Sequence, residues 1–264
     1  MSDSLFSVRD QIVLVSGGSR GIGKAIAAGF AERDAHVIVT GRDARTLSDA
    51  AKEIERDRPV QSIVCDVSSP GDIQRLVEQV MAEHGRIDTL LNVAGVNRRK
   101  PALDVTEDDF DFVTDINLKG AFLLSQAVGR HMAARGSGSQ VNIASLNTDR
   151  PLRNVLPYAM SKAAVGQMTR GLAMEWGSKG VRVNAIAPGF IQTDLTRKLW
   201  ADETMAAWGR ANIPQGRLGT PEELVGAAIF LASPAAAYVT GQILYVDGGF
   251  TAGWSWPIPA DGGQ

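Results

Sequence analysis

The sequence predicts a doubly wound α/β fold, in which about seven parallel strands form one sheet with helices on both faces. The strand candidates are rich in Val and Ile and lack polar alternation, which indicates burial on both sides. Segments with apolar residues at helical spacing separate them, such as Gly23–Asp34 and Asp72–Gly85. No Pro-, Gly- or Ser-rich linker divides the chain, so we expect a single domain over residues 1–264. In chain order the strand candidates are Gln11–Ser16, His36–Thr40, Gln61–Cys65, Ile87–Ala94, Gln140–Ser145, Val181–Pro188 and Gln242–Gly248.

A glycine-rich turn joins the first strand candidate to the first helix candidate. In "SGGSRGIGKAIAAGF", Gly17, Gly21 and Gly23 follow the spacing G-x-x-x-G-x-G. Glycine permits tight turning and lets backbone N–H groups approach a pyrophosphate at the positive end of a helix. Such a turn can also serve only as a tight connection. Its place after the first strand of a parallel sheet favours dinucleotide binding.

The second strand candidate ends in a turn that bears on the choice of dinucleotide. An acidic residue there binds the adenosine ribose hydroxyls, whereas an arginine accommodates a 2'-phosphate. Gly41 stands where the acid is expected and Arg42 follows it, while Arg20 in the glycine turn offers a second cation for the same dianion. Asp43 weakens this interpretation if the turn shifts by one residue, and two solvated surface arginines are the alternative. We expect NADP(H) to be preferred, with NAD(H) as the second choice.

The helix candidate after the fifth strand opens with "YAMSK", which suggests an acid–base pair. Tyr158 and Lys162 are four residues apart and therefore lie on one helical face. An ammonium beside the phenol is expected to lower the pKa of the tyrosine from its ordinary value of about 10. Tyr158 would then exchange a proton near neutrality. An ordinary amphipathic helix produces the same spacing by chance, so the pair gains weight only from the motifs around it.

The overall composition excludes several function classes. Apolar residues make up 44% and charged residues 21%, as in ordinary globular proteins, and a net charge of -2 gives no footprint for nucleic acid or an anionic membrane. The longest apolar run, Leu224–Ala232, is too short to span a bilayer. Cys65 is the single cysteine, which excludes an intrachain disulfide, and the N-terminus shows no secretory signal, so we expect a cytoplasmic protein. The scattered residues His36, His84 and His131 form no metal-ligand cluster, and we predict no metal.

Taken together, these motifs resemble the short-chain dehydrogenase/reductase family over about residues 10–250. The glycine turn matches the family's Thr-Gly-x-x-x-Gly-Ile-Gly with Ser16 in place of Thr, and "NVAG" matches its Asn-Asn-Ala-Gly with Val93 in place of the second Asn. "APGFIQTDL" looks like its Pro-Gly cofactor segment, and "YVDGG" looks like its last strand. The resemblance implies an NAD(P)-dependent oxidoreductase that acts on CH–OH groups.

The resemblance also implies roles for individual residues. The catalytic set is Asn117, Ser145, Tyr158 and Lys162. Ser145 would bind the substrate oxygen, Lys162 would hold the nicotinamide ribose, and Asn117 would anchor a water that links Lys162 to solvent. Asp66, directly after the third strand, is a candidate partner for the adenine amino group. The expected cofactor contacts are Gly17, Ser19, Arg20, Gly21, Ile22, Gly23, Arg42, Asp66, Val67, Asn92, Ala94, Gly95, Tyr158, Lys162, Pro188, Gly189, Ile191 and Thr193.

Two basic segments are expected to border the substrate cleft. "VNRRKP" follows "NVAG", and "LNTDRPLRNVLP" lies between Ser145 and Tyr158. A cationic rim suits a hydroxylated, anionic small molecule, and "GVNRRKP" resembles family members that act on sugar acids, such as gluconate 5-dehydrogenases and keto-deoxy-gluconate dehydrogenases. We expect a sugar acid or polyol as the substrate, and solvent-facing arginines are the alternative. The rim carries Arg98, Arg99, Lys100, Arg150 and Arg153 with Asn97, Asn147 and Asn154, offset only by Asp149, and the tentative substrate residues are Arg98, Asn147, Arg150 and Arg153.

Several further expectations concern assembly and competing functions. A 3-oxoacyl-thioester reductase would use the same catalytic set, and a non-catalytic dinucleotide-binding scaffold would use the same fold. The family resemblance implies a homotetramer. Residues 193–219 suggest a helical lid over the substrate, whose closure would exclude water from the path of the hydride. The tail over residues 252–264 contains Trp254 and Trp256, which suggests that it packs on something, such as a neighbouring subunit.

Overall fold

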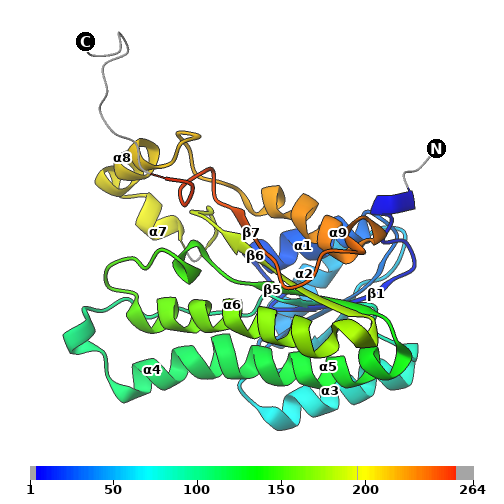
Figure 1. Ribbon diagram of the computed structural model, residues 1–264. Coiled ribbons are helices and arrows are strands. Elements are labelled where there is room, and N and C mark those ends of the chain that lie inside the picture. Colours follow the sequence, from blue (N-terminus) through cyan, green and yellow to red (C-terminus); the bar gives the residue numbers. More distant parts are fainter. Residues whose placement is uncertain (1–3, 195, 254–264) are drawn as a thin grey trace.

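The computed structural model describes residues 4–194 and 196–253 and is built on one seven-stranded sheet (Figure 1). The strand order is β3-β2-β1-β4-β5-β6-β7, and every neighbouring pair is parallel. The predicted fold class is therefore confirmed. The strands are β1 (Ile12–Ser16), β2 (His36–Gly41), β3 (Gln61–Val64), β4 (Thr89–Asn92), β5 (Gly138–Ile143), β6 (Val181–Pro188) and β7 (Ile243–Val246).

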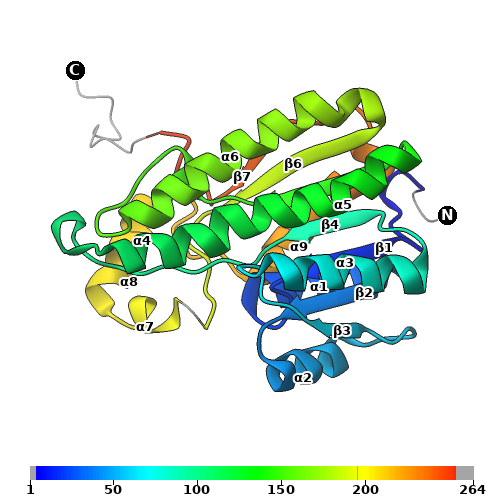
Figure 2. The same ribbon diagram turned by 90° about the horizontal axis from the view of Figure 1, so that it is seen from below.

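Helices cover both faces of this sheet. On one face pack α1, α2 and α9, and on the other pack α3, α5 and α6, which Figure 2 shows in front of the strands. The α-helices are α1 (Gly21–Ala31), α2 (Ala44–Ile54), α3 (Pro70–His84), α4 (Glu107–Thr114), α5 (Ala121–Arg135), α6 (Leu156–Trp176), α7 (Arg197–Trp200), α8 (Glu203–Asn212) and α9 (Val225–Ala232). The shorter elements are the 3-10 turns η1 (Ser4–Phe6), η2 (Ala102–Asp104), η4 (Leu146–Thr148), η5 (Gly177–Lys179), η6 (Pro221–Leu224) and η7 (Pro234–Ala236), and the π-helical turn η3 (Asp115–Gly120).

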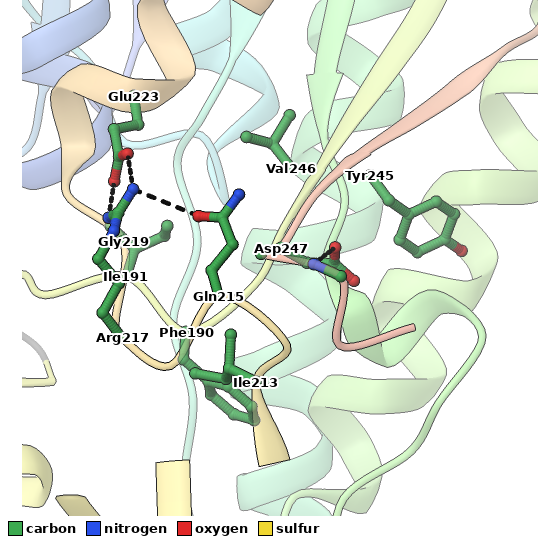
Figure 3. A pocket seen from close by; sticks show the side chains of 12 residues that line it. Phe190, Ile191, Ile213, Gln215, Arg217, Gly219, Glu223, Tyr245, Val246 and Asp247 are labelled. Carbon is green, nitrogen blue, oxygen red and sulfur yellow. Dashed lines mark hydrogen bonds and ion pairs between the residues drawn. The ribbon is translucent and has the colours of Figure 1, made fainter. Parts of the chain in front are cut away.

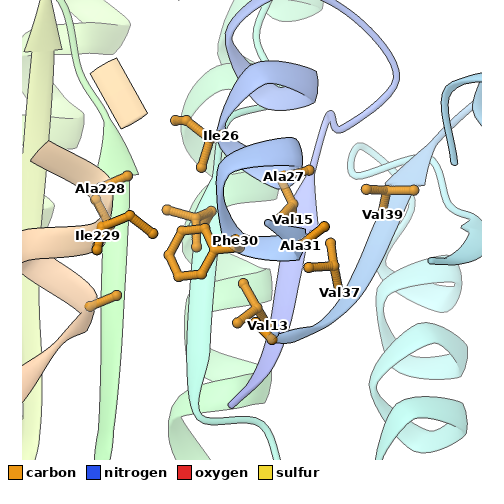
Figure 4. Close-up of a cluster of buried hydrophobic side chains, with 14 of the residues drawn as sticks. Val13, Val15, Ile26, Ala27, Phe30, Ala31, Val37, Val39, Ala228 and Ile229 are labelled. Carbon is orange, nitrogen blue, oxygen red and sulfur yellow. The ribbon is translucent and has the colours of Figure 1, made fainter. Parts of the chain in front are cut away.

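The core is divided by the sheet because strand side chains alternate between its faces. In β1, Val13 and Val15 join the cluster beneath α1, where Phe30 packs beside them (Figure 4). Ile12 and Leu14 point the other way and join the cluster beneath α3 and α5. Every residue of β1 is buried, which explains the apolar run over residues 12–15 before the buried Ser16.

The strand order reverses at β1, and this reversal locates the ligand crevice. From β1 the chain runs outward through β2 and β3, then returns to β4 on the other side of β1. Ligands of such sheets bind beyond the carboxyl ends of the strands at this switch point. The glycine turn follows β1 and the "NVAG" segment begins at the end of β4, so both reach that edge.

The predicted lid segment contains two helices, α7 and α8, which lie above the sheet in Figure 1. They pack on Phe190, whose ring makes edge-to-face contacts with Trp200 at 5.3 Å, Trp208 at 5.6 Å and Phe250 at 4.9 Å between centroids. Within 4–194 and 196–253, no helix has both the length and the apolar character that crossing a membrane requires. Of the predicted tail, residues 254–264, with Trp254 and Trp256, lie outside the described residues.

Candidate active site

A cleft of about 900 Å³ opens at the carboxyl edge of the sheet. It runs from the glycine turn past the ends of β2 and β3 to the start of α6. Most of the cofactor residues expected from the sequence line it: Gly17, Ser19, Arg20, Gly21, Ile22, Gly23, Arg42, Asp66, Val67, Ala94, Gly95, Tyr158, Lys162 and Thr193. The cleft is also lined by Thr40, Gly41, Asp43, Cys65, Val93, Val96, Ile116, Ile143 and Asp194, which were not assigned to it from the sequence.

The glycine turn is shaped for the close approach of a ligand's phosphates. Gly17 has a φ of 74°, and a Cβ there would lie 2.8 Å from the backbone of Ala94. A Cβ on Gly23 would collide with the carbonyl oxygen of Gly17, so only glycine lets α1 start this close to the turn. The N-terminus of α1 then presents its free N–H groups to the cleft. These features fit the pyrophosphate of a dinucleotide.

The far end of the cleft carries two exposed arginines. Arg20 is the residue before α1, and Arg42 follows β2. Both therefore flank the same opening of the cleft, which we call its mouth. Asp43, which left the sequence argument open, caps α2 by accepting a hydrogen bond from Thr46 N at 2.7 Å. Hydrogen bonding from the Thr46 side chain, and then from this backbone N–H, holds the pKa of Asp43 below its ordinary value. The carboxylate is thus engaged with the helix that follows it.

Tyr158 and Lys162 meet at the other end of the cleft. Lys162 Nζ lies 5.7 Å from the centroid of the Tyr158 ring and donates a hydrogen bond to Ile143 O at 2.6 Å. Lys162 is 4% exposed, and burial lowers the pKa of its ammonium to about 8. The predicted pair therefore exists at the predicted place.

The expected effect of Lys162 on the pKa of Tyr158 is wrong for this structure. Burial raises the pKa of Tyr158 above its ordinary value of 10.0, while a hydrogen bond with Ser145 and the positive charge of Arg99 lower it by less. Desolvation dominates because the phenolate would lose more hydration than its neighbours return. The phenol thus holds its proton at neutral pH.

Ser145 lies two residues after the last residue of β5, beside Tyr158. It is buried and begins the turn η4, where its Oγ accepts hydrogen bonds from Asn147 N at 3.1 Å and Asn147 Nδ2 at 3.3 Å. These bonds fix the oxygen and leave its O–H free to point at Tyr158. Asn147, expected at the substrate, is buried and also accepts from Leu152 N at 3.0 Å, so it shapes this turn instead.

Asn117 lies in the π-helical turn η3 between α4 and α5 and is buried. Its Oδ1 accepts from Val96 N at 2.8 Å, and its Nδ2 donates to Val96 O at 2.9 Å and to Ser161 Oγ at 3.1 Å. A Cβ on Gly95 would lie 3.5 Å from Asn117 Oδ1 and 3.6 Å from Lys162 Nζ. The side chain therefore fastens the segment after β4 beside Lys162, and its expected water contact remains a prediction.

Four expected cofactor residues do not line the cleft. Asn92 is buried beneath it and donates to Ser125 Oγ at 2.8 Å and Asn142 Oδ1 at 2.9 Å, which ties β4 to α5 and β5. Pro188 is the last residue of β6. A Cβ on the next residue, Gly189, would collide with the backbone of Asp247, so glycine is needed for this close approach. Ile191 lines a second cavity of about 470 Å³, together with Arg217 and its partner Glu223 (Figure 3). This cavity is separate from the cleft.

The basic rim is less cationic than the sequence indicated. Arg98 NH1 lies 3.0 Å from Asp109 Oδ1, and Lys100 Nζ lies 2.5 Å from Asp109 Oδ2. Asp109 was missed because it lies on another element, eleven residues after Arg98. Of the remaining rim, Arg150 lies beside Asp149 at 3.5 Å and Arg153 is exposed. Neither Arg98 nor Asn147 is thus a free substrate ligand in this structure.

Arg99 is the rim cation whose charge acts on Tyr158. It is exposed, makes no hydrogen bond or ion pair with the residues in 4–194 and 196–253, and its charge lowers the pKa of Tyr158. The sequence placed Arg99 in the rim but did not separate it from its neighbours. The signal that could have done so is the acidic first turn of α4, "EDD", which offers carboxylates to Arg98 and Lys100.

Comparison with known proteins agrees with this geometry. The family model described as "Enoyl-(Acyl carrier protein) reductase" matches residues 17–251. The chain is 44% identical to 2-dehydro-3-deoxy-D-gluconate 5-dehydrogenase of Pseudoalteromonas atlantica, over 93% of this chain and 97% of the relative. It is 40% identical to gluconate 5-dehydrogenase of Gluconobacter oxydans, over 94% and 97%. A solved gluconate 5-dehydrogenase from Burkholderia cenocepacia, in complex with NADP and tartrate, matches with a TM-score of 0.91 at 37% identity, over 95% of this chain and 98% of that one. The chain belongs to the short-chain dehydrogenase/reductase family, as its motifs predicted.

Proposed function

We propose that this protein catalyses the reversible, NADP-linked oxidation of one secondary hydroxyl group of a sugar acid. The observation that carries the proposal is the meeting of Tyr158, Lys162 and Ser145 at one end of a cleft whose other end is the glycine turn. A dinucleotide bound along this cleft would bring its reactive end to the tyrosine. When bound, the nicotinamide exchanges a hydride with the carbinol carbon of the substrate.

The protein's own groups would handle the proton and the geometry. In the direction of reduction, Tyr158 gives its proton to the carbonyl oxygen as the hydride arrives; in oxidation it takes the hydroxyl proton back. Ser145 Oγ is fixed beside the phenol and would donate a hydrogen bond to the same oxygen. Within residues 4–194 and 196–253, the side chain of Lys162 makes one hydrogen bond, to Ile143 O, which leaves two N–H donors for ribose hydroxyls.

The preference for NADP rests on the two arginines at the mouth. Arg20 and Arg42 both line the cleft and make no ion pair among the described residues, while Asp43 caps α2. A 2'-phosphate between two guanidinium groups would gain charge-assisted hydrogen bonds that a ribose hydroxyl would not. NAD(H) remains the second choice of the proposal.

The preference for an anionic, hydroxylated substrate rests on Arg99. The charge of Arg99 lowers the pKa of Tyr158, and Arg99 has no carboxylate partner in the described chain. Its positive charge is therefore available to bind a substrate carboxylate. Sugar-acid dehydrogenases among the relatives support the same class. Arg150 and Arg153 would extend the rim, and closure of the helical segment over residues 193–219 would shield the site from water.

We include a homotetramer and a cytoplasmic location in the proposal. The exposed face of α5 and α6 carries Phe122 at 39%, Met160 at 48% and Met174 at 85% exposure. A Cβ on Gly171 in α6 would meet no atom of the described residues within 4 Å, so this face is open to a second copy. Size-exclusion chromatography with light scattering tests the assembly, and a monomeric mass would refute it.

A substrate screen tests the proposed reaction. Absorbance of the reduced cofactor would be followed with NADP and with NAD in parallel, using D-gluconate, other sugar acids, neutral polyols and a 3-oxoacyl thioester. The proposal expects the highest kcat/KM with a sugar acid and NADP. The thioester is included because the matching family model carries an acyl-carrier-protein reductase description. If a thioester or a neutral polyol outperforms every sugar acid, the substrate proposal is wrong, and no turnover of any compound would favour a non-catalytic scaffold.

A further inference from the structure

The segment that carries Arg99 is fastened on both sides of that residue. At its start, Val96 is bonded through both backbone groups to the side chain of Asn117, at 2.8 and 2.9 Å. At its end, Lys100 N donates to Asn154 O at 3.0 Å. The side chains of Arg98 and Lys100, the two neighbours of Arg99, both turn to Asp109. Arg99 alone is left without such a partner among the residues described.

Asp109 is built to hold those two neighbours. Its side chain is 5% exposed, and its Oδ2 also accepts from Thr106 N at 3.2 Å and Thr106 Oγ1 at 2.9 Å, which completes the capping box of α4. The guanidinium of Arg98 in turn lies 4.0 Å from the centroid of the Phe112 ring, one turn further along α4. The carboxylate thus links the first turn of a helix to a loop that would otherwise depend on its end contacts.

We propose that Asp109 is a positioning residue for substrate recognition: by holding Arg98 and Lys100 it presents Arg99 to the carboxylate of the substrate beside Tyr158. This inference rests on the proposed function, in which Arg99 recognises an anionic substrate. A segment that is already fixed loses less conformational entropy when the substrate binds. An arginine on such a segment therefore binds a carboxylate more tightly than an arginine on a mobile segment. Asp109 itself touches neither the cleft nor the catalytic pair.

Two possible roles of Asp109 predict opposite changes in the KM for an anionic substrate when Asp109 is replaced by Asn. Asp109→Asn keeps the shape and an oxygen acceptor for Thr106 but removes the charge that attracts both cations. If Asp109 acts only through its field, its removal makes the rim more positive, and the KM for an anion should fall. If Asp109 positions Arg99, the segment loosens and the KM for an anion should rise.

The test compares D-gluconate with the neutral polyol D-threitol, using NADP and the full chain. For Asp109→Asn we expect the KM for D-gluconate to rise about tenfold with kcat within about twofold, and kcat/KM for D-threitol to stay within about twofold. Asp108→Asn is the matched control, since it removes the same charge one residue earlier from an exposed side chain. In the Arg99→Ala background, Asp109→Asn should add nothing further, because both changes act through the same contact.

A second variant and a second measurement keep the test independent of folding and of the substrate. Lys100→Met breaks the same link from the loop side and leaves the capping box intact, so it should raise the KM for D-gluconate in the same direction. Hydrogen exchange should become faster at residues 96–100 in both variants and remain unchanged in α6. Unchanged exchange there in both variants, or a lower KM for D-gluconate in Asp109→Asn, would overturn the inference. If the wild-type enzyme shows no preference for the carboxylate substrate, or if Arg99→Ala keeps that preference, the proposed function fails instead, and the exchange data still decide whether Asp109 fixes the segment.

Discussion

Replacing Lys162 with Met is expected to change stability in a strongly pH-dependent manner. Lys162 is 4% exposed, and its Nζ has Ile143 O as hydrogen-bond acceptor at 2.6 Å. Burial lowers the pKa of this ammonium from 10.5 to about 8. Because the pKa in the folded chain lies below that in the unfolded chain, the unfolded state binds more protons between these two values. The charged lysine therefore opposes folding below pH 8, and this penalty disappears as the pH rises toward 10.5.

The size of the effect follows from the two pKa values. Each unit of pKa corresponds to about 1.4 kcal/mol, so the penalty at neutral pH is about 3 kcal/mol. Between about pH 7 and about pH 9.5 it falls by about 2 kcal/mol. The methionine variant has a side chain of similar length without a titrating group. It leaves the Ile143 carbonyl without its partner, which lowers stability by about 1–3 kcal/mol at every pH and so shifts the offset without changing the slope.

Urea unfolding followed by tryptophan fluorescence measures this difference. Wild type, Lys162→Met and the control Lys52→Met, at an exposed position of α2, would be compared at one protein concentration. We expect the wild type to gain about 2 kcal/mol relative to Lys162→Met between about pH 7 and about pH 9.5, and no such gain relative to Lys52→Met. Equal pH dependence of wild type and Lys162→Met would show that the ammonium is not desolvated, and the reasoning about this site would be refuted.

Three further predictions concern the cleft. Tyr158→Phe should abolish turnover, while cofactor affinity, measured by fluorescence titration, stays nearly unchanged. Because burial raises the pKa of the Tyr158 phenol, the wild-type rate of alcohol oxidation should increase from neutral toward alkaline pH. A flat pH–rate profile would contradict the assignment of Tyr158 as the acid–base group. Arg42→Ala should raise the KM for NADP by about 10–100-fold and leave the KM for NAD nearly constant, since it removes a charge-assisted hydrogen bond to the 2'-phosphate alone; equal losses with both cofactors in steady-state kinetics would argue against that contact. Gly23→Ala should lower stability by about 1–3 kcal/mol and weaken cofactor binding, because the added methyl collides with Gly17 O; an unchanged melting temperature and cofactor Kd would show that α1 can move away freely.

Much of the fold could be predicted because its signals are local or periodic. The apolar runs of β1 and β2 are dictated by burial on both faces, and a parallel sheet leaves few other arrangements for such strands. The glycine turn was readable because only glycine tolerates the close approach of Gly17 to Ala94. Tyr158 and Lys162 were readable because both belong to one helix, where spacing in sequence fixes spacing in space.

The parts that could not be predicted depend on contacts between distant elements. The position of Asn92 at the end of β4 predicts that it lines the cleft. Its side-chain amide instead donates hydrogen bonds to Asn142 and Ser125 beneath the cleft. Arg98 and Asp109 are on different elements, and no periodicity brings them together. The pKa of Tyr158 depends on how much water the folded chain removes from the phenol, which is a property of packing and not of the nearest cation.

The opposite pKa shifts of Tyr158 and Lys162 set the order in which the two side chains lose their protons. Burial raises the pKa of Tyr158 and lowers that of Lys162 to about 8. As the pH rises, the Lys162 ammonium therefore loses its proton and becomes neutral before the Tyr158 phenol ionises. A neutral lysine cannot stabilise a phenolate, so in the mechanism that we propose the free protein is suited to give a proton to a carbonyl and not to take one from an alcohol. Any group that accepts hydrogen bonds from the two unused Nζ donors would raise the pKa of Lys162 and restore the charge that oxidation needs. In the proposed mechanism, acid–base competence for oxidation is thus linked to occupancy of the cleft, because Tyr158 and Lys162, which would supply it, also line the cleft.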